Sequence, residues 1–121
     1  MTSIGNYAFY GCNKLTAMAV PESVTSIGDY AFYYCSSLTS ITIPESVTSI
    51  GKNAFYDCTG ELVVNCNIPA SSSYSGGAFY KSKFTKVTIG NNVTSIGDYA
   101  FYYCSSLTSI TLPEGVTSIG D

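Results

Sequence analysis

The 121-residue sequence contains no histidine, arginine or tryptophan, and charged residues make up only 11% of it. Without histidine it lacks the side chain that most often acts as a general base or metal ligand, and its eight carboxylates are scattered. A net charge of −3 with five lysines also excludes the basic surface that phosphate neutralisation requires. We therefore expect no enzyme, no cofactor, no metal site and no nucleic-acid partner.

Long apolar stretches are missing as well. The sequence has no run of eighteen or more apolar residues, so no membrane insertion is expected. Residues 1–20 lack the charged and apolar regions of a signal peptide. Ser, Thr, Tyr, Gly and Asn supply the polarity instead, which predicts a hydroxyl-rich and nearly neutral surface.

What the sequence does have is repetition. Residues Val24–Thr42 return unchanged as Val93–Thr111, 69 residues later, and diverged copies fill the interval. An Ala-Phe pair marks five copies, which begin 23, 23, 24 and 22 residues apart, at Ala8, Ala31, Ala54, Ala78 and Ala100. A period near 23 residues predicts a solenoid of about five stacked units, because each unit alone cannot bury its apolar side chains.

Each unit has a strand pattern followed by a turn pattern. Ser40–Ile43 alternates polar and apolar residues and meets Pro44, which predicts a short parallel strand ending there. Val47–Ile50 predicts a second, shorter strand, and Asn53–Cys58 is long enough for one helical or 3₁₀ turn on the opposite side. The segments that match the first strand are Ala17–Val20, Lys86–Ile89 and Ser109–Leu112.

The unit LTSITIPESVTSIGKNAFYDC and the final stretch LTSITLPEGVTSIGD resemble the BspA-like leucine-rich repeats, whose pattern is Leu-x-x-Ile-x-Ile-Pro, Val-x-x-Ile-Gly and Ala-Phe-x-x-Cys. The resemblance covers nearly the whole chain and implies a right-handed leucine-rich-repeat solenoid. It also implies a surface or secreted protein of bacteria that colonise the mouth and gut, and adhesion to host or bacterial proteins or glycans.

Residues 1–121 are expected to form this single solenoid, cut within a repeat at both ends. Uncapped ends would expose apolar faces, so end-to-end self-association is a further expectation. One repeat, at about residues 59–92, is irregular: residues 71–77 replace the Val-Thr-Ser-Ile-Gly block, and Ser82 stands where Cys is expected. Apart from Val63, the residues between Leu62, Val64, Cys66 and Ile68 are polar or small, so the alternation of a strand is kept. We therefore predict a longer strand followed by a bulging loop.

Several polar positions recur in columns. One column contains Cys12, Cys35, Cys58 and Cys104. Buried free thiols are the favoured interpretation over a disulfide, and the spacing cannot build a tetrahedral zinc site. Another column contains Glu22, Glu45 and Glu114, which we interpret as solvated turn residues. A third, with Asp29, Asp98, Asn6 and Asn53, is predicted to cap the helical turns.

The tyrosines are the main candidates for ligand contact, because aromatic side chains offer large contact areas at low entropic cost. The candidates in the two identical stretches are Tyr30, Tyr33, Tyr34, Tyr99, Tyr102 and Tyr103. Packing between adjacent turns is the alternative role for these rings. In and after the irregular repeat, Tyr74, Lys81, Lys83 and Lys86 are further candidates, since loops on rigid scaffolds carry function and three of the five lysines gather there.

The resulting hypothesis is a non-enzymatic recognition or adhesion module of an extracellular or cell-surface bacterial protein. It would bind a host or bacterial protein or glycan through columns of Tyr, Ser and Thr. The alternative is a passive spacer that holds another domain away from the cell surface.

Overall fold

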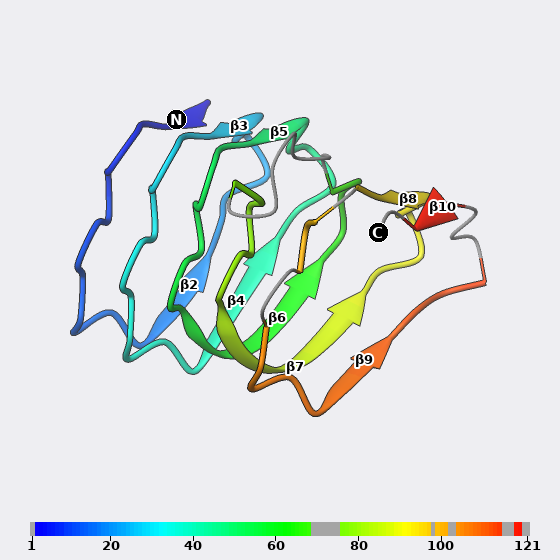
Figure 1. Cartoon of the computed structure of the whole chain (residues 1–121). Coiled ribbons are helices and arrows are strands. Elements are labelled where there is room, and N and C mark those ends of the chain that lie inside the picture. Colours follow the sequence, from blue (N-terminus) through cyan, green and yellow to red (C-terminus); the bar gives the residue numbers. More distant parts are fainter. Residues whose placement is uncertain (1, 69–75, 98, 102–103, 115–117, 120–121) are drawn as a thin grey trace.

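The computed structural model describes residues 2–68, 76–97, 99–101, 104–114 and 118–119. In these residues the chain winds into successive coils, and strands of consecutive coils lie side by side (Figure 1). Ile41 pairs with Met18 of the preceding coil and with Leu62 of the following one, all in parallel register. The predicted solenoid of parallel strands is therefore confirmed.

The larger sheet has five parallel strands in the order β2-β4-β6-β7-β9. In β4 the burial alternates, with Ile41 and Ile43 inside and Ser40 and Thr42 exposed, as the polar-apolar pattern predicts. The five strands are β2 (Ala17–Ala19), β4 (Ser40–Ile43), β6 (Thr59–Val64), β7 (Lys83–Ile89) and β9 (Ser109–Thr111).

A second side of the coils has two smaller parallel sheets of two-residue strands. One contains β1 (Ser3–Ile4), β3 (Ser26–Ile27) and β5 (Ser49–Ile50), and the other contains β8 (Ser95–Ile96) and β10 (Ser118–Ile119). The irregular repeat lies between them, and among its described residues only Ile68 joins this side, through a bridge to Ile96. The ladder on this side is thus divided where the repeat is irregular.

The third side of each coil contains turns, and none of the described residues is helical. The predicted helical turn is wrong because left-handed residues interrupt it: Tyr30 and Tyr34 have φ values of 57° and 62°. Their N–H groups donate to Lys52 O and Tyr56 O of the next coil, at 3.0 and 2.9 Å, whereas Tyr33 N donates to Tyr30 O at 3.2 Å. Hydrogen bonds between coils alternate here with hydrogen bonds inside one turn.

None of the described residues forms a helix with the length and apolar character that crossing a membrane would demand.

Asp29 does not cap a helix. Its Oδ1 atom accepts a hydrogen bond from Lys52 N of the next coil at 2.8 Å, and Asp29 N donates to Asn6 Oδ1 at 2.8 Å. Asn53 occupies the position of Tyr30 in its coil, since both precede the recurring Ala and both have positive φ. The capping prediction was therefore wrong for Asp29 and misplaced Asn53, while Asp98 lies outside the described residues.

Phenylalanines form the centre of the core. Neighbouring ring centroids in the column are 5.0–5.1 Å apart, and the rings of Phe32 and Phe55 are fully buried. The column contains Phe9, Phe32, Phe55, Phe79 and Phe101. This recurring stack, with the aliphatic ladders beside it, makes every inner coil contribute equivalent apolar surface.

The cysteine column has a structural role in the core. The thiols of Cys35, Cys58 and Cys104 donate to phenylalanine carbonyl oxygens one coil earlier, at 3.2, 2.8 and 3.1 Å. Ser82, where the column lacks a cysteine, lies 3.2 Å from Cys104 Sγ. Each of these sulfhydryl groups thus finds a hydrogen-bond acceptor within the core.

The irregular repeat has the longer strand that was predicted, β6, with six residues, but this strand ends at Val64, before Cys66 and Ile68. Strand β7, predicted only over Lys86–Ile89, is also long, with seven residues. Their register shifts between Gly60 and Glu61, where Gly60 has a φ of 95°. Cys66 is buried, but it lies after the end of β6. Within β6, the register puts Leu62 and Val64 at the inward positions that isoleucine fills in β4. The predicted bulging loop falls on residues 69–75, outside the described residues.

Candidate functional site

The turn side of the solenoid presents a ladder of stacked tyrosines. Tyr10 and Tyr33 have ring centroids 5.0 Å apart at an interplanar angle of 1°, and Tyr33 and Tyr56 are 4.5 Å apart at 7°. Tyr80 continues the column at 5.9 Å in a tilted arrangement. We call these four residues the tyrosine ladder. It exists because the residue after the recurring Ala-Phe pair is Tyr in each of these copies.

Two further positions flank this ladder. Tyr7 stacks on Tyr30 with centroids 5.2 Å apart and an angle of 8°, and Tyr34 meets Tyr33 edge-on at 4.5 Å. Several of these rings remain accessible: Tyr7, Tyr10 and Tyr34 are 56%, 49% and 43% exposed. The stacking therefore fixes the rings without burying them, which leaves a rigid aromatic surface at low entropic cost.

Four described tyrosines have left-handed backbone conformations, namely Tyr7, Tyr30, Tyr34 and Tyr99. This conformation disfavours bulky side chains and suits Gly, Asn and Asp. At equivalent positions the chain also has residues that adopt the left-handed conformation with less strain. Gly11 and Asp57 occupy the same repeat position as Tyr34. Tyrosine at these positions is consequently not required by the backbone.

The ladder ends at a small hollow with two lysines. Its volume is about 340 Å³, and the side chains that line it are Tyr34, Tyr56, Asp57, Lys81, Lys83 and Ser105. Lys83 Nζ forms an ion pair with Asp57 Oδ1 at 2.8 Å, and Lys81 Nζ lies 5.5 Å from the ring centroid of Tyr80. We call this feature the lysine hollow. Residues of four successive coils meet in it.

The electrostatics of this surface follow from its crowding. Burial, together with the neighbouring Tyr34 and Tyr56, raises the pKa of Tyr33 to about 12, so its hydroxyl stays protonated and can donate a hydrogen bond. The hydrogen bond to Asp57 raises the pKa of Lys83, which remains an ammonium group. The surface thus combines neutral phenols, two ammonium groups and one carboxylate.

The structure brings together some of the predicted contact residues. Tyr30, Tyr33 and Tyr34 share the aromatic surface, and Lys81 and Lys83 border its end. Lys86 lies elsewhere, on the exposed face of β7, where its backbone is in register with Glu61 and Ser109. Tyr99 is half-buried and does not line the hollow. Three predicted contact residues, Tyr74, Tyr102 and Tyr103, lie outside the described residues.

Three residues of the hollow were absent from the predicted set: Tyr56, Asp57 and Ser105. The signal was present in the repeat alignment, because Tyr56 shares the position of Tyr33 and Asp57 that of Tyr34. Side chains at one repeat position lie about 4.8 Å apart in neighbouring coils. Aligning every copy by position would therefore have placed Asp57 beside Lys81.

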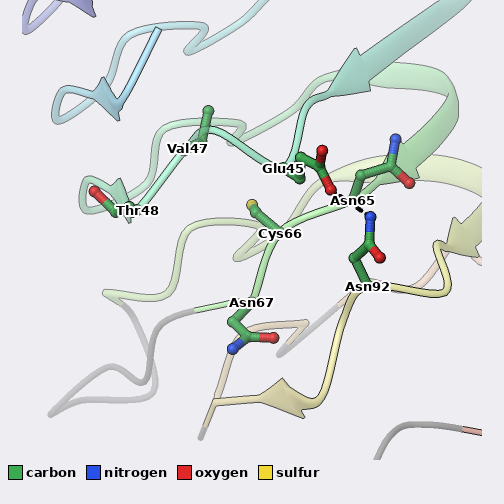
Figure 2. Close-up of a pocket in the computed structure, with 7 residues that line it drawn as sticks. All are labelled: Glu45, Val47, Thr48, Asn65, Cys66, Asn67 and Asn92. Atoms are coloured by element: carbon green, nitrogen blue, oxygen red, sulfur yellow. Dashed lines mark hydrogen bonds between the residues drawn. The ribbon is translucent and has the colours of Figure 1, made fainter. Parts of the chain in front are cut away.

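A second hollow lies where the two smaller sheets are divided, and Figure 2 shows the side chains that line it. This groove, which we call the sheet-break groove, has a volume of about 560 Å³. Its lining residues are Glu45, Val47, Thr48, Asn65, Cys66, Asn67 and Asn92. Asn92 Nδ2 donates to Glu45 Oε2 across it. No aromatic ring and no lysine lies among these residues.

Asparagines of the irregular repeat hold the walls of this groove in place. Asn67 Oδ1 accepts hydrogen bonds from Thr94 N at 2.8 Å and Ser95 N at 3.3 Å. Asn65 Oδ1 sits against Gly90, where an added Cβ would lie 1.9 Å from that oxygen. The Asn67 side chain accepts from Thr94 N in place of the main-chain oxygen that Thr48 N uses in a regular coil, so the groove is explained by local structure. Burial raises the pKa of the Cys66 thiol to about 11, which makes it a poor nucleophile at neutral pH.

Within the described ranges, no group of three or more His, Cys, Asp or Glu side chains is arranged to hold a metal ion.

Comparison with curated proteins gives no match. Residues 72–121 match the family described as BspA type Leucine rich repeat region, with six copies. The matched residues include the second perfect copy of the repeat.

Solved structures give a similarity over the whole chain. A leucine rich cell surface protein from Faecalibacterium prausnitzii A2-165 is 34% identical over 98% of the chain, with a TM-score of 0.59. A leucine-rich repeat protein from Eubacterium ventriosum ATCC 27560 is 25% identical over 99% of the chain, with a TM-score of 0.36. The chain spans 32% of the first structure and 47% of the second. The repeat pattern, the coil geometry and the first of these similarities identify the chain as a leucine-rich-repeat solenoid whose residues 72–121 match the BspA-type family.

Proposed function

We propose that this chain is a non-enzymatic recognition module of a bacterial surface or secreted protein. It binds a protein or glycan of a host or bacterial surface through the tyrosine ladder, its flanking tyrosines and the lysine hollow. The similarity to a leucine rich cell surface protein supports the location. A rigid scaffold with many small contacts supports the mode of binding, because little entropy is lost when a preformed surface binds its ligand.

One observation carries the proposal. Tyr30 and Tyr34 hold left-handed backbone conformations that Asn53 and Asp57 hold at equivalent positions of the next coil. A bulky residue in that conformation costs about 1–2 kcal/mol. Since the fold accepts smaller polar residues there, the half-buried Tyr30 and the exposed Tyr34 favour contact with a ligand over a purely structural role.

The test is an array experiment with the 121-residue chain. Fluorescently labelled chain is applied to printed mucins, extracellular matrix proteins and glycans, beside the Tyr34→Asn variant and the Thr42→Asn variant. Thr42 lies exposed on β4, away from the ladder, and provides the matched control. We expect saturable binding by the wild type and the Thr42 variant, and loss of that signal with Tyr34→Asn.

The passive spacer is the competing function. It predicts no saturable ligand on the array for any of the three proteins. Equal binding by the wild type and Tyr34→Asn would instead move the contact surface away from the tyrosines, and would overturn the site assignment.

A further inference from the structure

The lysine hollow differs in charge from the rest of the molecule. The chain has a net charge of −3, yet this hollow contains two of its five lysines and one carboxylate. The ion pair between Lys83 and Asp57 joins these two side chains at 2.8 Å, and the Lys83 side chain remains 57% exposed. The hollow thus has a local charge of +1 and contains both hydrogen-bond donors and acceptors.

The main chain around the hollow is already hydrogen-bonded between coils. Tyr34 N donates to Tyr56 O at 2.9 Å, and Asp57 N donates to Lys81 O at 3.3 Å. An extended peptide therefore finds no strand edge here to pair with, and recognition depends on side chains. The volume of about 340 Å³ fits a small ligand group better than a protein surface.

The side chains have the chemistry of a saccharide site. The rings of Tyr34 and Tyr56 offer aromatic surface to the C–H groups of a sugar ring. The carboxylate of Asp57 and the hydroxyl of Ser105 can pair with sugar hydroxyls. The ammonium groups of Lys81 and Lys83 add a preference for negative charge.

We propose that the lysine hollow binds the acidic sugar of an anionic glycan, with a carboxylate or sulfate group facing Lys81 and Lys83. This inference rests on the proposed recognition function and specifies its ligand class. The sugar ring lies against the tyrosines, and Asp57 positions Lys83 while it accepts a hydrogen bond from a sugar hydroxyl.

The experiment is an NMR titration of the ¹⁵N-labelled chain with lactose, 3′-sialyllactose and 3′-sulfolactose. The three probes share one core and differ in charge, so the two acidic probes separate carboxylate from sulfate recognition. We expect at least one acidic probe to bind about tenfold or more tightly than lactose at low salt, with weaker binding as the salt concentration rises. Chemical-shift changes should centre on the amides of residues 34, 56–57, 81–83 and 105.

Lys81→Gln should bring the affinity for the acidic probe down to that for lactose. Lys86→Gln is the matched control, because it removes the same charge from an exposed position on β7 and leaves the hollow intact. A folded spectrum for both variants establishes that the comparison is valid. Loss of the preference in both variants would show general charge attraction and overturn the assignment.

Equal affinity for all three probes, or no binding of any probe, would also overturn this inference. Neither outcome overturns the recognition function, which is decided by the array signal of Tyr34→Asn. A phosphotyrosine peptide that binds where the acidic sugars do not would replace the saccharide with an acidic peptide, and would refute the proposed ligand class.

Discussion

Gly51 faces the backbone of the preceding coil at a distance that leaves no space for a side chain. A Cβ added there would lie 2.4 Å from both Asp29 N and Asp29 Oδ1, and 2.5 Å from Gly28 C. Gly5 has the same position in its repeat, but a Cβ added there has no atom within 4 Å. The two glycines therefore separate the cost of coil contact from the intrinsic effect of replacing glycine.

The magnitude follows from what a methyl group displaces. Overpacking against backbone costs about 1–3 kcal/mol. Moving Asp29 also strains its 2.8 Å hydrogen bond to Lys52 N, and a hydrogen bond to a charged group is worth about 1.5–3 kcal/mol. Against this, replacing glycine gains about 0.4–1 kcal/mol by restricting the unfolded chain. We expect Gly51→Ala to lower the free energy of unfolding by about 3 kcal/mol.

The assay is urea unfolding followed by far-ultraviolet circular dichroism and by tyrosine fluorescence, which the absence of tryptophan makes available. Gly5→Ala should leave the free energy of unfolding unchanged or raise it by about 0.5 kcal/mol. Equal stability of the two variants would refute the argument that close contact between coils requires glycine at this repeat position.

Two further predictions concern the core. Phe55→Ala removes a fully buried ring between Phe32 and Phe79, so urea unfolding should show a fall of about 3–5 kcal/mol in the free energy of unfolding. Phe9 is half-buried, so Phe9→Ala should lower the free energy of unfolding by less. Equal losses for the two variants would contradict the role of the phenylalanine column. Burial raises the pKa of the Cys66 thiol from 9.0 to about 11, so the unfolded chain loses this proton first as the pH rises. Stability should consequently fall above pH 9, by about 1.4 kcal/mol per pH unit more in the wild type than in Cys66→Ala; parallel stability curves from pH 9 to 11 would contradict it.

Much of the fold could be predicted because the same residue types recur at the same positions in successive copies of the repeat. Ser40–Ile43 was predicted with the bounds that β4 has, since alternation and a following proline both mark the strand. Stacking of equivalent residues, as in Phe32 on Phe55, follows directly from parallel coils in register. Repetition therefore supplies long-range contacts that a single copy of a motif cannot.

The turn side was mispredicted because its repeat pattern, Ala-Phe-x-x-Cys, fixes which residues recur but not their backbone conformation. Asn53–Cys58 has a length that suits a helical turn, and only the left-handed conformations of Asn53 and Asp57 redirect it. The lysine hollow depends on which coils are adjacent, and the irregular repeat shifts the spacing there by one residue. The sheet-break groove depends on Asn67 replacing a main-chain acceptor and on Asn65 lying against Gly90, which no alternation of residues indicates.

The central claim is that the flanking tyrosines serve recognition more than stability, and the double variant Tyr30→Asn, Tyr34→Asn tests it most directly. Relief of the left-handed strain should raise the free energy of unfolding, and loss of the aromatic contacts should lower it. The two effects should cancel to within about 1 kcal/mol. The measurement pairs urea unfolding with titration of the ligand found on the array. We predict nearly unchanged stability and at least about a tenfold loss of affinity. Unchanged affinity together with a stability loss of about 3 kcal/mol or more would show that these rings are packing elements, and would contradict the account.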